Sequence, residues 1–292
     1  MTTWLVLPPI VFGSVDSRCF ASVFPLWNAA DLPRDFQLAG DLVRFSFGVF
    51  LPLFETEPGR PPHPPTAILL HPNVLAIAAR GARPRIIPLS NLQYVEYGHF
   101  LLQGWIGLVS NGRMNRFPFN TLKRYAVDEL MRRLTAAWAP EDYSLPASHV
   151  EAAVDLDQKF RYAEADALGP RETILTRFFS RTQMSPSRIL DGRPPHRNAG
   201  DYLALTSRRL LWITERNRGC REPYGSILRF APLKNLTEVF VHCSGRNTGL
   251  FCRLKSGTLW YIPLEADGID YGYRFADQVR QIIRPGFARH PD

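Results

Sequence analysis

Arginine is the residue type whose number and spacing in this chain could support binding chemistry. Three stretches of the second half, residues 181–200, 215–224 and 243–248, are rich in it. They carry Arg181, Arg188, Arg193, Arg197, Arg216, Arg218, Arg221 and Arg246, against three carboxylates only, those of Asp191, Glu215 and Glu222. A guanidinium group donates two parallel hydrogen bonds to an oxyanion. Brought together, these side chains would form a site for phosphate or another anion.

Residues for covalent or metal chemistry do not form such a pattern. The sequence has no G-x-S-x-G, H-E-x-x-H, Walker, Rossmann or EF-hand motif. Its four cysteines, Cys19, Cys220, Cys243 and Cys252, form no C-x-x-C and have no histidine at zinc-ligand spacing. We therefore expect no catalytic residues, no metal and no cofactor, and a protein that is not an enzyme. Scattered free thiols favour a reducing compartment, so we expect a cytoplasmic location.

An internal repeat organises the segments that carry the arginines. Gly59-Arg-Pro-Pro-His63 recurs as Gly192-Arg-Pro-Pro-His196, and Arg44-Phe45 recurs as Arg177-Phe178, both 133 residues later. Further landmarks follow in the same order. Pro88-Leu-x-Asn-Leu92 recurs as Pro232-Leu-x-Asn-Leu236, and Asn111-Gly112 recurs as Ser256-Gly257. The offset in residue number between equivalent positions grows only slowly along the chain, so we interpret the chain as two copies of one domain.

Each copy is long enough to bury its own core, which indicates a tandem pair and not a solenoid. We divide the chain into an N-terminal arm (1–35), a first domain (36–138), an acidic linker that is part helical (139–168), a second domain (169–284) and a C-terminal tail (285–292). The charge is uneven. Residues 169–292 hold 20 Lys and Arg against 11 Asp and Glu, whereas residues 1–168 hold 15 against 16. The positive field therefore belongs to the second copy.

Hydrophobic periodicity predicts seven short strands and then one helix in each copy. In the first copy the strands are 42–51, 68–70, 74–79, 85–89, 92–97, 104–109 and 114–119, and the apolar helix stripe runs from Val127 to Trp138. In the second copy they are 173–179, 202–206, 210–214, 227–231, 236–242, 250–254 and 259–264, followed by a stripe from Phe275 to Ile283. Residues 150–167 read as a helix or an irregular linker. Residues 4–7 and 20–27 could be strands or a packing arm.

Seven strands followed by a helix, twice, resembles the pleckstrin-homology-like (PH-like) superfold. The segment Asp201-Tyr-Leu-Ala-Leu-Thr-Ser-Arg-Arg-Leu-Leu-Trp-Ile213 resembles the L-x-L-T-x-x-R-L-x-W hairpin of its GRAM, GLUE and bacterial PH branches. The first copy departs from that hairpin, with Ala76 at the place of Trp212. The resemblance implies a mainly β fold of two tandem seven-stranded barrels or sandwiches, each capped by a C-terminal α-helix. It also implies that Arg208 and Arg209 are structural parts of the hairpin.

The resemblance also brings the arginines together. In a meander of antiparallel strands, the loops after the first, third and fifth strands emerge at one end, and in PH-like domains this end often binds phosphoinositide headgroups. The equivalent loops of the first copy carry a poorer set, namely Glu55, Glu57, Arg60, His63, Arg80 and Arg83. We therefore expect the second copy to bind the anion. Loops also collect charge simply because they are solvated, and the arginines have that interpretation too.

The sequence thus favours a non-enzymatic adaptor that docks on anionic membrane, with phosphoinositide as a candidate lipid, or on a partner protein. The alternative is a pure protein-interaction scaffold in a larger assembly, such as a trafficking coat or a chaperone, without lipid binding. Nucleic acid is an unlikely partner because no RNP-like or KH-like signature accompanies the aromatics, and we expect Trp212, Phe240, Phe251, Trp260 and Tyr261 to be core or inter-domain packing. No apolar run reaches 18 residues, so any membrane contact would be peripheral.

Overall fold

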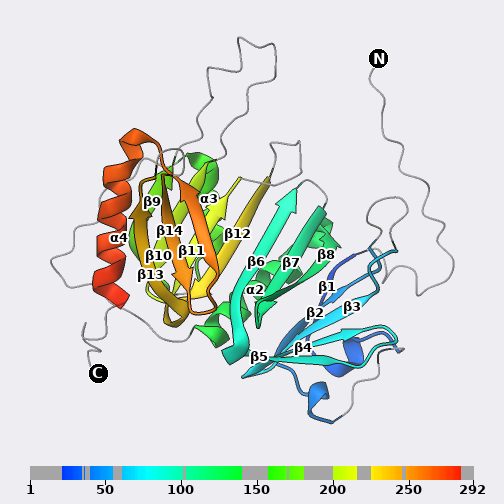
Figure 1. Cartoon of the computed structure of the whole chain (residues 1–292). Coiled ribbons are helices and arrows are strands. Elements are labelled where there is room, and N and C mark those ends of the chain that lie inside the picture. The colour runs from blue at the N-terminus through cyan, green and yellow to red at the C-terminus, as the bar shows by residue number, and fades with distance from the viewer. Residues whose placement is uncertain are drawn as a thin grey trace, which may run out of the picture.

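A computed structural model describes residues 22–34, 36, 40–54, 61–100, 103–139, 157–169, 171–180, 200–215, 225–244 and 248–283 (Figure 1). These residues are mainly β, as the sequence predicts, with three sheets and three α-helices among them. No sheet closes on itself within the described part of the chain, so the fold is sheets packed on one another and not a closed barrel.

The first repeat forms seven strands and a helix. The strands are β2 (Phe47–Leu51), β3 (Thr66–Leu70), β4 (Val74–Ala79), β5 (Arg85–Pro88), β6 (Leu92–Phe100), β7 (Gln103–Ser110) and β8 (Arg113–Asn120), and the helix is α2 (Tyr125–Trp138). A short strand, β1 (Phe24–Leu26), precedes them and pairs with β2. Apolar runs between turn residues therefore indicated all seven strands, and the 3.6-residue stripe located the helix.

The second repeat has the same order of elements. Its strands are β9 (Ile174–Ser180), β10 (Asp201–Thr206), β11 (Arg209–Thr214), β12 (Gly225–Pro232), β13 (Leu236–His242), β14 (Gly249–Leu254) and β15 (Leu259–Pro263), and its helix is α4 (Ile269–Ile283). Between the repeats lies α3 (Gln158–Ala167), inside the linker where the sequence indicated part helix.

The two repeats share a sheet. The strand order is β1-β2-β3-β4-β5 in one sheet, β13-β14-β15 in a second, and β8-β7-β6-β12-β11-β10-β9 in a third. Figure 1 shows this seven-stranded sheet crossing the middle of the molecule from β9 to β8. Its centre is the antiparallel pair β6–β12, in which Val95 lies opposite Phe230 and Glu96 opposite Arg229. Backbone hydrogen bonds between strands therefore join the repeats directly.

The repeated Pro-Leu-x-Asn-Leu motif has one local structure in both places. Residues 89–91 and 233–235 each form a 3₁₀-helix that follows a strand and leads into the next one. Its first residue is preceded by a proline with φ −56° in both copies. Gly112 and Gly257 then occupy the left-handed region, at φ 71° and 80°, in the hairpins that follow. Glycine adopts this conformation without a side-chain penalty, which explains why the turn uses it twice.

Three details of the sequence interpretation are wrong. The predicted strand 42–51 begins only at Phe47, because residues 40–43 form a 3₁₀-helix that leaves Val43 40% exposed. Phe45 therefore precedes β2, whereas Phe178 lies inside β9, and the two are not equivalent. The hairpins close at Leu70–Leu75 and Leu205–Leu210, and from these pairs Trp212 matches Ile77 and not Ala76.

The first four strands of each repeat, β2–β5 and β9–β12, have an outer face that another segment covers. Leu26, Phe45, Phe50 and Leu69 belong to one buried cluster, so the segment around β1 packs on the outside of β2–β4. On the second repeat, Phe160 of α3 is 1% exposed and lies 5.1 Å, between ring centroids, from Phe179. The helices that end the two repeats pack on different strands. Helix α2 packs mainly on β1 and β2, and α4 packs on β13, β9 and β14.

Candidate functional site

Two of the three arginine-bearing stretches of the second repeat begin and end at neighbouring strand ends of the seven-stranded sheet. Asp201, at the start of β10, lies opposite both Ser180, the last residue of β9, and Thr214, the last residue of β11. Thr214 in turn lies opposite Ile227 near the start of β12. The stretches 181–200 and 215–224 therefore leave from neighbouring strand ends. All eight predicted anion-binding residues, Arg181, Arg188, Arg193, Arg197, Arg216, Arg218, Arg221 and Arg246, lie outside the described residues.

The described residues at this edge include two carboxylates that are already engaged. Glu215 accepts a hydrogen bond from the Gly200 backbone N–H at 2.9 Å and forms an ion pair with Lys159 of α3. Asp201 is fully buried and accepts from the Trp212 indole Nε1 at 3.0 Å. Of the three carboxylates in the arginine-bearing stretches, that of Glu215 therefore has a cation of its own.

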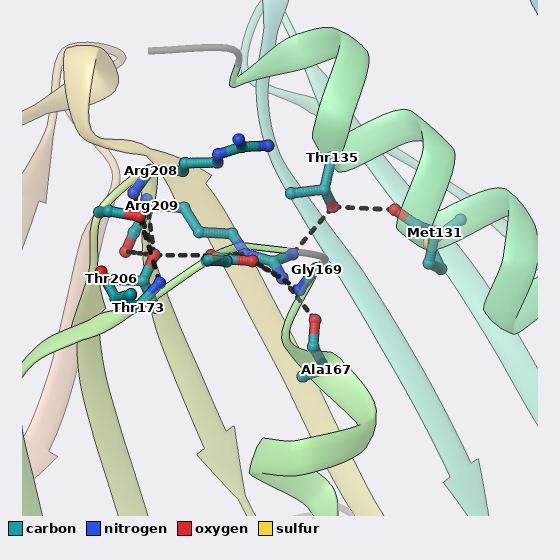
Figure 2. Close-up of polar contacts among 10 residues, drawn as sticks. Met131, Thr135, Ala167, Gly169, Thr173, Thr206, Arg208 and Arg209 are labelled. Carbon is teal, nitrogen blue, oxygen red and sulfur yellow. Dashed lines mark hydrogen bonds and ion pairs between the residues drawn. The ribbon is translucent and has the colours of Figure 1, made fainter. Parts of the chain in front are cut away.

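At the opposite end of β10 and β11, Arg209 occupies the centre of a buried polar network (Figure 2). Its guanidinium holds the Glu172 carboxylate through Nε and Nη2, each at 2.8 Å, and both side chains are almost fully buried. Nη1 donates to Thr135 Oγ1 of α2 at 2.8 Å, and Nη2 also donates to the Ala167 carbonyl at the end of α3. The hairpin arginine therefore connects the second repeat to α2 and to α3.

The Glu172 carboxylate accepts further hydrogen bonds. It accepts from Thr206 Oγ1 at 2.6 Å and from the Gly169 N–H at 2.8 Å. Burial alone would raise the pKa of Glu172, but the charge and hydrogen bonds of Arg209, with those of Thr206 and Gly169, outweigh it and lower the pKa of this carboxyl. The pair therefore stays ionised at neutral pH, and each buried charge is balanced by its partner.

A second charged cluster lies on the β6–β12 junction. Glu96 is 1% exposed and accepts from Arg229 Nε at 2.8 Å, Arg116 Nη2 at 2.7 Å and the Trp105 indole at 2.7 Å. Arg229 also stacks on Trp212, 4.4 Å from its ring centroid. Burial would raise the pKa of Glu96, but the nearby guanidinium groups, Arg229 first, and the indole hydrogen bond bring it below the ordinary value. Sequence reasoning did not identify this cluster, because its charges come from three separate strands.

A small pocket lies beside these clusters, between α2, α3, β6 and β12. Within it, Tyr97 donates to Asp128 at 2.7 Å, and Arg124 lies 3.5 Å from Asp128 and 3.6 Å from Asp166. Burial raises the pKa of Asp128, and burial with the charge of Arg124 lowers the pKa of His99. The contacts of Arg124 are long and its side chain is 41% exposed, so we interpret the pocket as a packing defect where four elements meet.

The aromatic residues of the second repeat divide into two groups. Trp212 and Trp260 are buried in its core, with Tyr94 of the first repeat packed edge-on against Trp260 at 5.6 Å. Phe240, Phe251 and Tyr261 point the other way, onto the outer face of β13–β15, where Tyr261 is 36% exposed. The expectation of core or inter-domain packing is confirmed for the two tryptophans and is wrong for these three. The sequence contained this information, because Trp260 and Tyr261 are adjacent in one strand and must point to opposite faces of the sheet.

Within the described residues, no three His, Cys, Asp or Glu side chains gather in a way that could hold a metal ion. None of the helices that the structure describes has the length and apolar character needed to cross a membrane. Among known proteins, no family model matches the chain and no curated sequence gives a significant match.

Proposed function

We propose that the chain is a tandem pair of PH-like domains that acts as a non-enzymatic adaptor and docks on anionic membrane through the arginine-bearing edge of its second repeat. The observation that carries the proposal is that two stretches of the chain, which hold seven of the eight arginines, begin and end at the neighbouring strand ends Ser180, Asp201, Thr214 and Gly225. The element order of four strands, three strands and a helix, found twice, supports the PH-like interpretation.

Charge supports the choice of an anionic ligand. The arginines face three carboxylates in their own stretches, and one of these, Glu215, is neutralised by Lys159. An excess of guanidinium groups at one edge attracts a surface of phosphates over a Debye length of about 8 Å at physiological salt. Arginine forks also match phosphate oxygens in geometry, which favours lipid headgroups such as phosphoinositides.

Co-sedimentation with vesicles tests the proposal. We expect the full chain to bind vesicles that contain phosphatidylserine or phosphoinositide, and to be released as salt rises from 50 to 500 mM, because the attraction is electrostatic. Arg188→Glu combined with Arg218→Glu should reduce this binding by about tenfold or more, since each reversal replaces attraction by repulsion.

The matched control is Arg80→Glu with Arg83→Glu, which makes the same change of net charge between β4 and β5 of the first repeat, the equivalent of the stretch that carries Arg218. This control should retain most of the binding. Equal losses in the two double variants would indicate a nonspecific effect of net charge and would contradict the proposed edge. Binding that is absent from every vesicle composition would favour the protein-interaction scaffold instead.

A further inference from the structure

The outer face of the β13–β15 sheet carries a row of aromatic rings in register. Phe240 lies opposite Phe251, and Phe251 opposite Tyr261, so one ring comes from each strand. Their centroids are 5.3 and 5.0 Å apart along the row. The inward residues of the same strands, among them Val239, Cys252 and Trp260, fill the core. The row is therefore additional apolar surface that the fold of the second repeat does not use.

Two further rows flank the aromatic one. On one side Glu238, Arg253 and Leu259 lie opposite one another, and on the other side His242, Gly249 and Pro263 do. We call the side chains of these three rows the aromatic face. Gly249 is required there, because a Cβ atom at this position would lie 2.2 Å from the Tyr261 ring. The ring therefore lies across the glycine and extends the apolar surface into the third row.

The equivalent positions of the first repeat show what such a face can do. Counted from the matching 3₁₀-helices, Phe240, Phe251 and Tyr261 take the places of Glu96, Gly107 and Arg116. In the first repeat, Glu96 of this row binds Arg229 of the other repeat. In the part of the chain that the structure describes, no segment is seated in the same way on the aromatic face.

The charges of the aromatic face select the kind of partner. Its one carboxylate, Glu238, is paired with its one guanidinium, Arg253, at 3.0 Å, so the face has no net charge apart from His242. A phosphate-rich surface, whether membrane or nucleic acid, would therefore gain little attraction here. An apolar aromatic face without net charge is typical of protein–protein contact.

We propose that the aromatic face binds the same face of a second copy of this chain, around a two-fold axis that is perpendicular to the strands and lies in the contact plane. This axis reverses the strand direction and exchanges the two outer rows. Phe240, Phe251 and Tyr261 then meet their own counterparts. Glu238 of one copy faces His242 of the other, and Leu259 faces Pro263.

Arg253 distinguishes this axis from the alternative. In the proposed dimer it faces Gly249 and the Tyr261 ring that lies across it, a position that suits a cation above an aromatic ring. A two-fold axis parallel to the strands would instead place Arg253 against Arg253 of the other copy, with repulsion between the guanidinium groups. Aligned packing of two such sheets, about 10 Å apart, is a common arrangement in β proteins.

The size of the contact predicts a weak dimer. The face presents nine positions, fewer than the roughly 20 residues a side of a standard interface, so we expect dissociation in the micromolar range. Salt should strengthen the association, because two copies with a formal charge of +8 each repel one another at low ionic strength. This salt dependence is opposite in sign to that expected for membrane binding, so the two proposals can fail separately.

Sedimentation equilibrium of the full chain at concentrations from 1 to 200 µM tests the proposal. We expect a monomer–dimer equilibrium that is weakened at least tenfold by Phe251→Glu. The control is Leu122→Glu, which adds the same charge at an apolar side chain that is 71% exposed on the first repeat. Phe251→Ala provides a second variant, to be compared after far-ultraviolet circular dichroism confirms folding. A wild-type chain that stays monomeric at 200 µM would overturn the proposal. A Phe251→Ala chain that dimerises as strongly as the wild type would overturn it too.

Disulfide cross-linking tests the orientation. In a background with Cys19, Cys220 and Cys243 replaced by serine and Cys252 buried, a mixture of Glu238→Cys and His242→Cys chains should form mixed dimers on mild oxidation, because these positions face one another across the proposed axis. A mixture of Glu238→Cys and Leu259→Cys chains should not. The reverse result would exclude the proposed axis. Vesicle binding by Phe251→Glu should remain as in the wild type, since the arginine-bearing edge is unchanged.

Discussion

Arg209 is the residue at which the sequence interpretation and the structure agree most closely. The hairpin motif indicated a structural arginine, and the side chain is buried in a network that reaches both neighbouring helices. Its partners could not be predicted. Glu172 lies 37 positions away and Thr135 lies 74 positions away, and neither stands in a motif that marks it as a partner. A pattern in one strand identifies the residue, whereas the contact depends on how three elements meet.

The ion pair of Arg209 and Glu172 predicts a pH-dependent stability. Because the pKa of Glu172 is lowered in the folded chain, its contribution is present above the ordinary value of about 4.5 and is lost as the pH falls through the folded pKa. Glu172→Gln should therefore lower the free energy of unfolding by about 3 kcal/mol at pH 7, because it leaves Arg209 buried without a counter-ion. Urea titrations at a series of pH values, from pH 7 down to the acid limit of the folded state, measure the effect.

Once the pH passes below the lowered pKa, the wild-type carboxyl becomes protonated, so the difference between wild type and Glu172→Gln should shrink. Asp277→Asn is the control, because Asp277 pairs with Arg280 at the surface and exposed pairs contribute less than about 1 kcal/mol. A difference that keeps its full size over the whole acid range would contradict the role of the Glu172 charge.

Elements were more predictable than contacts, and the errors have physical causes. Strands β4 and β13 begin and end at the residues that the sequence predicts, because turn-forming residues stand on both sides of each apolar run. Periodicity placed the start of the first strand at residue 42, whereas β2 begins at Phe47. Phe45 is buried on the outer face of the sheet and not in its core, and periodicity cannot tell these two surfaces apart. The arginines of the candidate edge stay a prediction, because they lie outside the described residues.

Helix α3 is predicted to be a separately removable element. Phe160 anchors it, with its ring 5.1 Å from Phe179 and 6.3 Å from Tyr202. Phe160→Ala removes this anchor at the edge of the core, so we expect α3 to undock while the strands stay folded. Hydrogen exchange should then lose at least tenfold protection in residues 158–167. Tyr162→Ala, at a side chain that is 64% exposed on the same helix, should leave the protection unchanged. Loss of protection throughout β3 and β4 as well would contradict a local effect.

For the whole molecule, the distinctive feature is that two similar repeats are joined asymmetrically. Strand β6 of the first repeat pairs with β12 of the second, while β13, which follows the same 3₁₀-helix as β6, has α4 along it. Arg280 of α4 donates to the Val239 carbonyl of β13 at 3.2 Å. The helix thus covers one strand edge and leaves the other to pair, and we infer that this difference limits the shared sheet to two repeats. A sequence repeat predicts two similar units and gives no information about this difference.

The shared sheet predicts that both repeats unfold together. Since β6 and β12 form continuous backbone pairing and Glu96 binds Arg229 across it, neither repeat can unfold without exposing buried surface of the other. Calorimetry of the full chain should show one transition whose calorimetric and van't Hoff enthalpies agree. Glu96→Ala leaves two guanidinium groups without their carboxylate, and it should lower the free energy of unfolding by about 3 kcal/mol while the transition stays single. Arg132→Ala, which removes a surface pair with Glu129, should have little effect. Two resolved transitions, with Glu96→Ala shifting only the one that involves β7 and β8, would instead mean that the repeats are independent domains in contact.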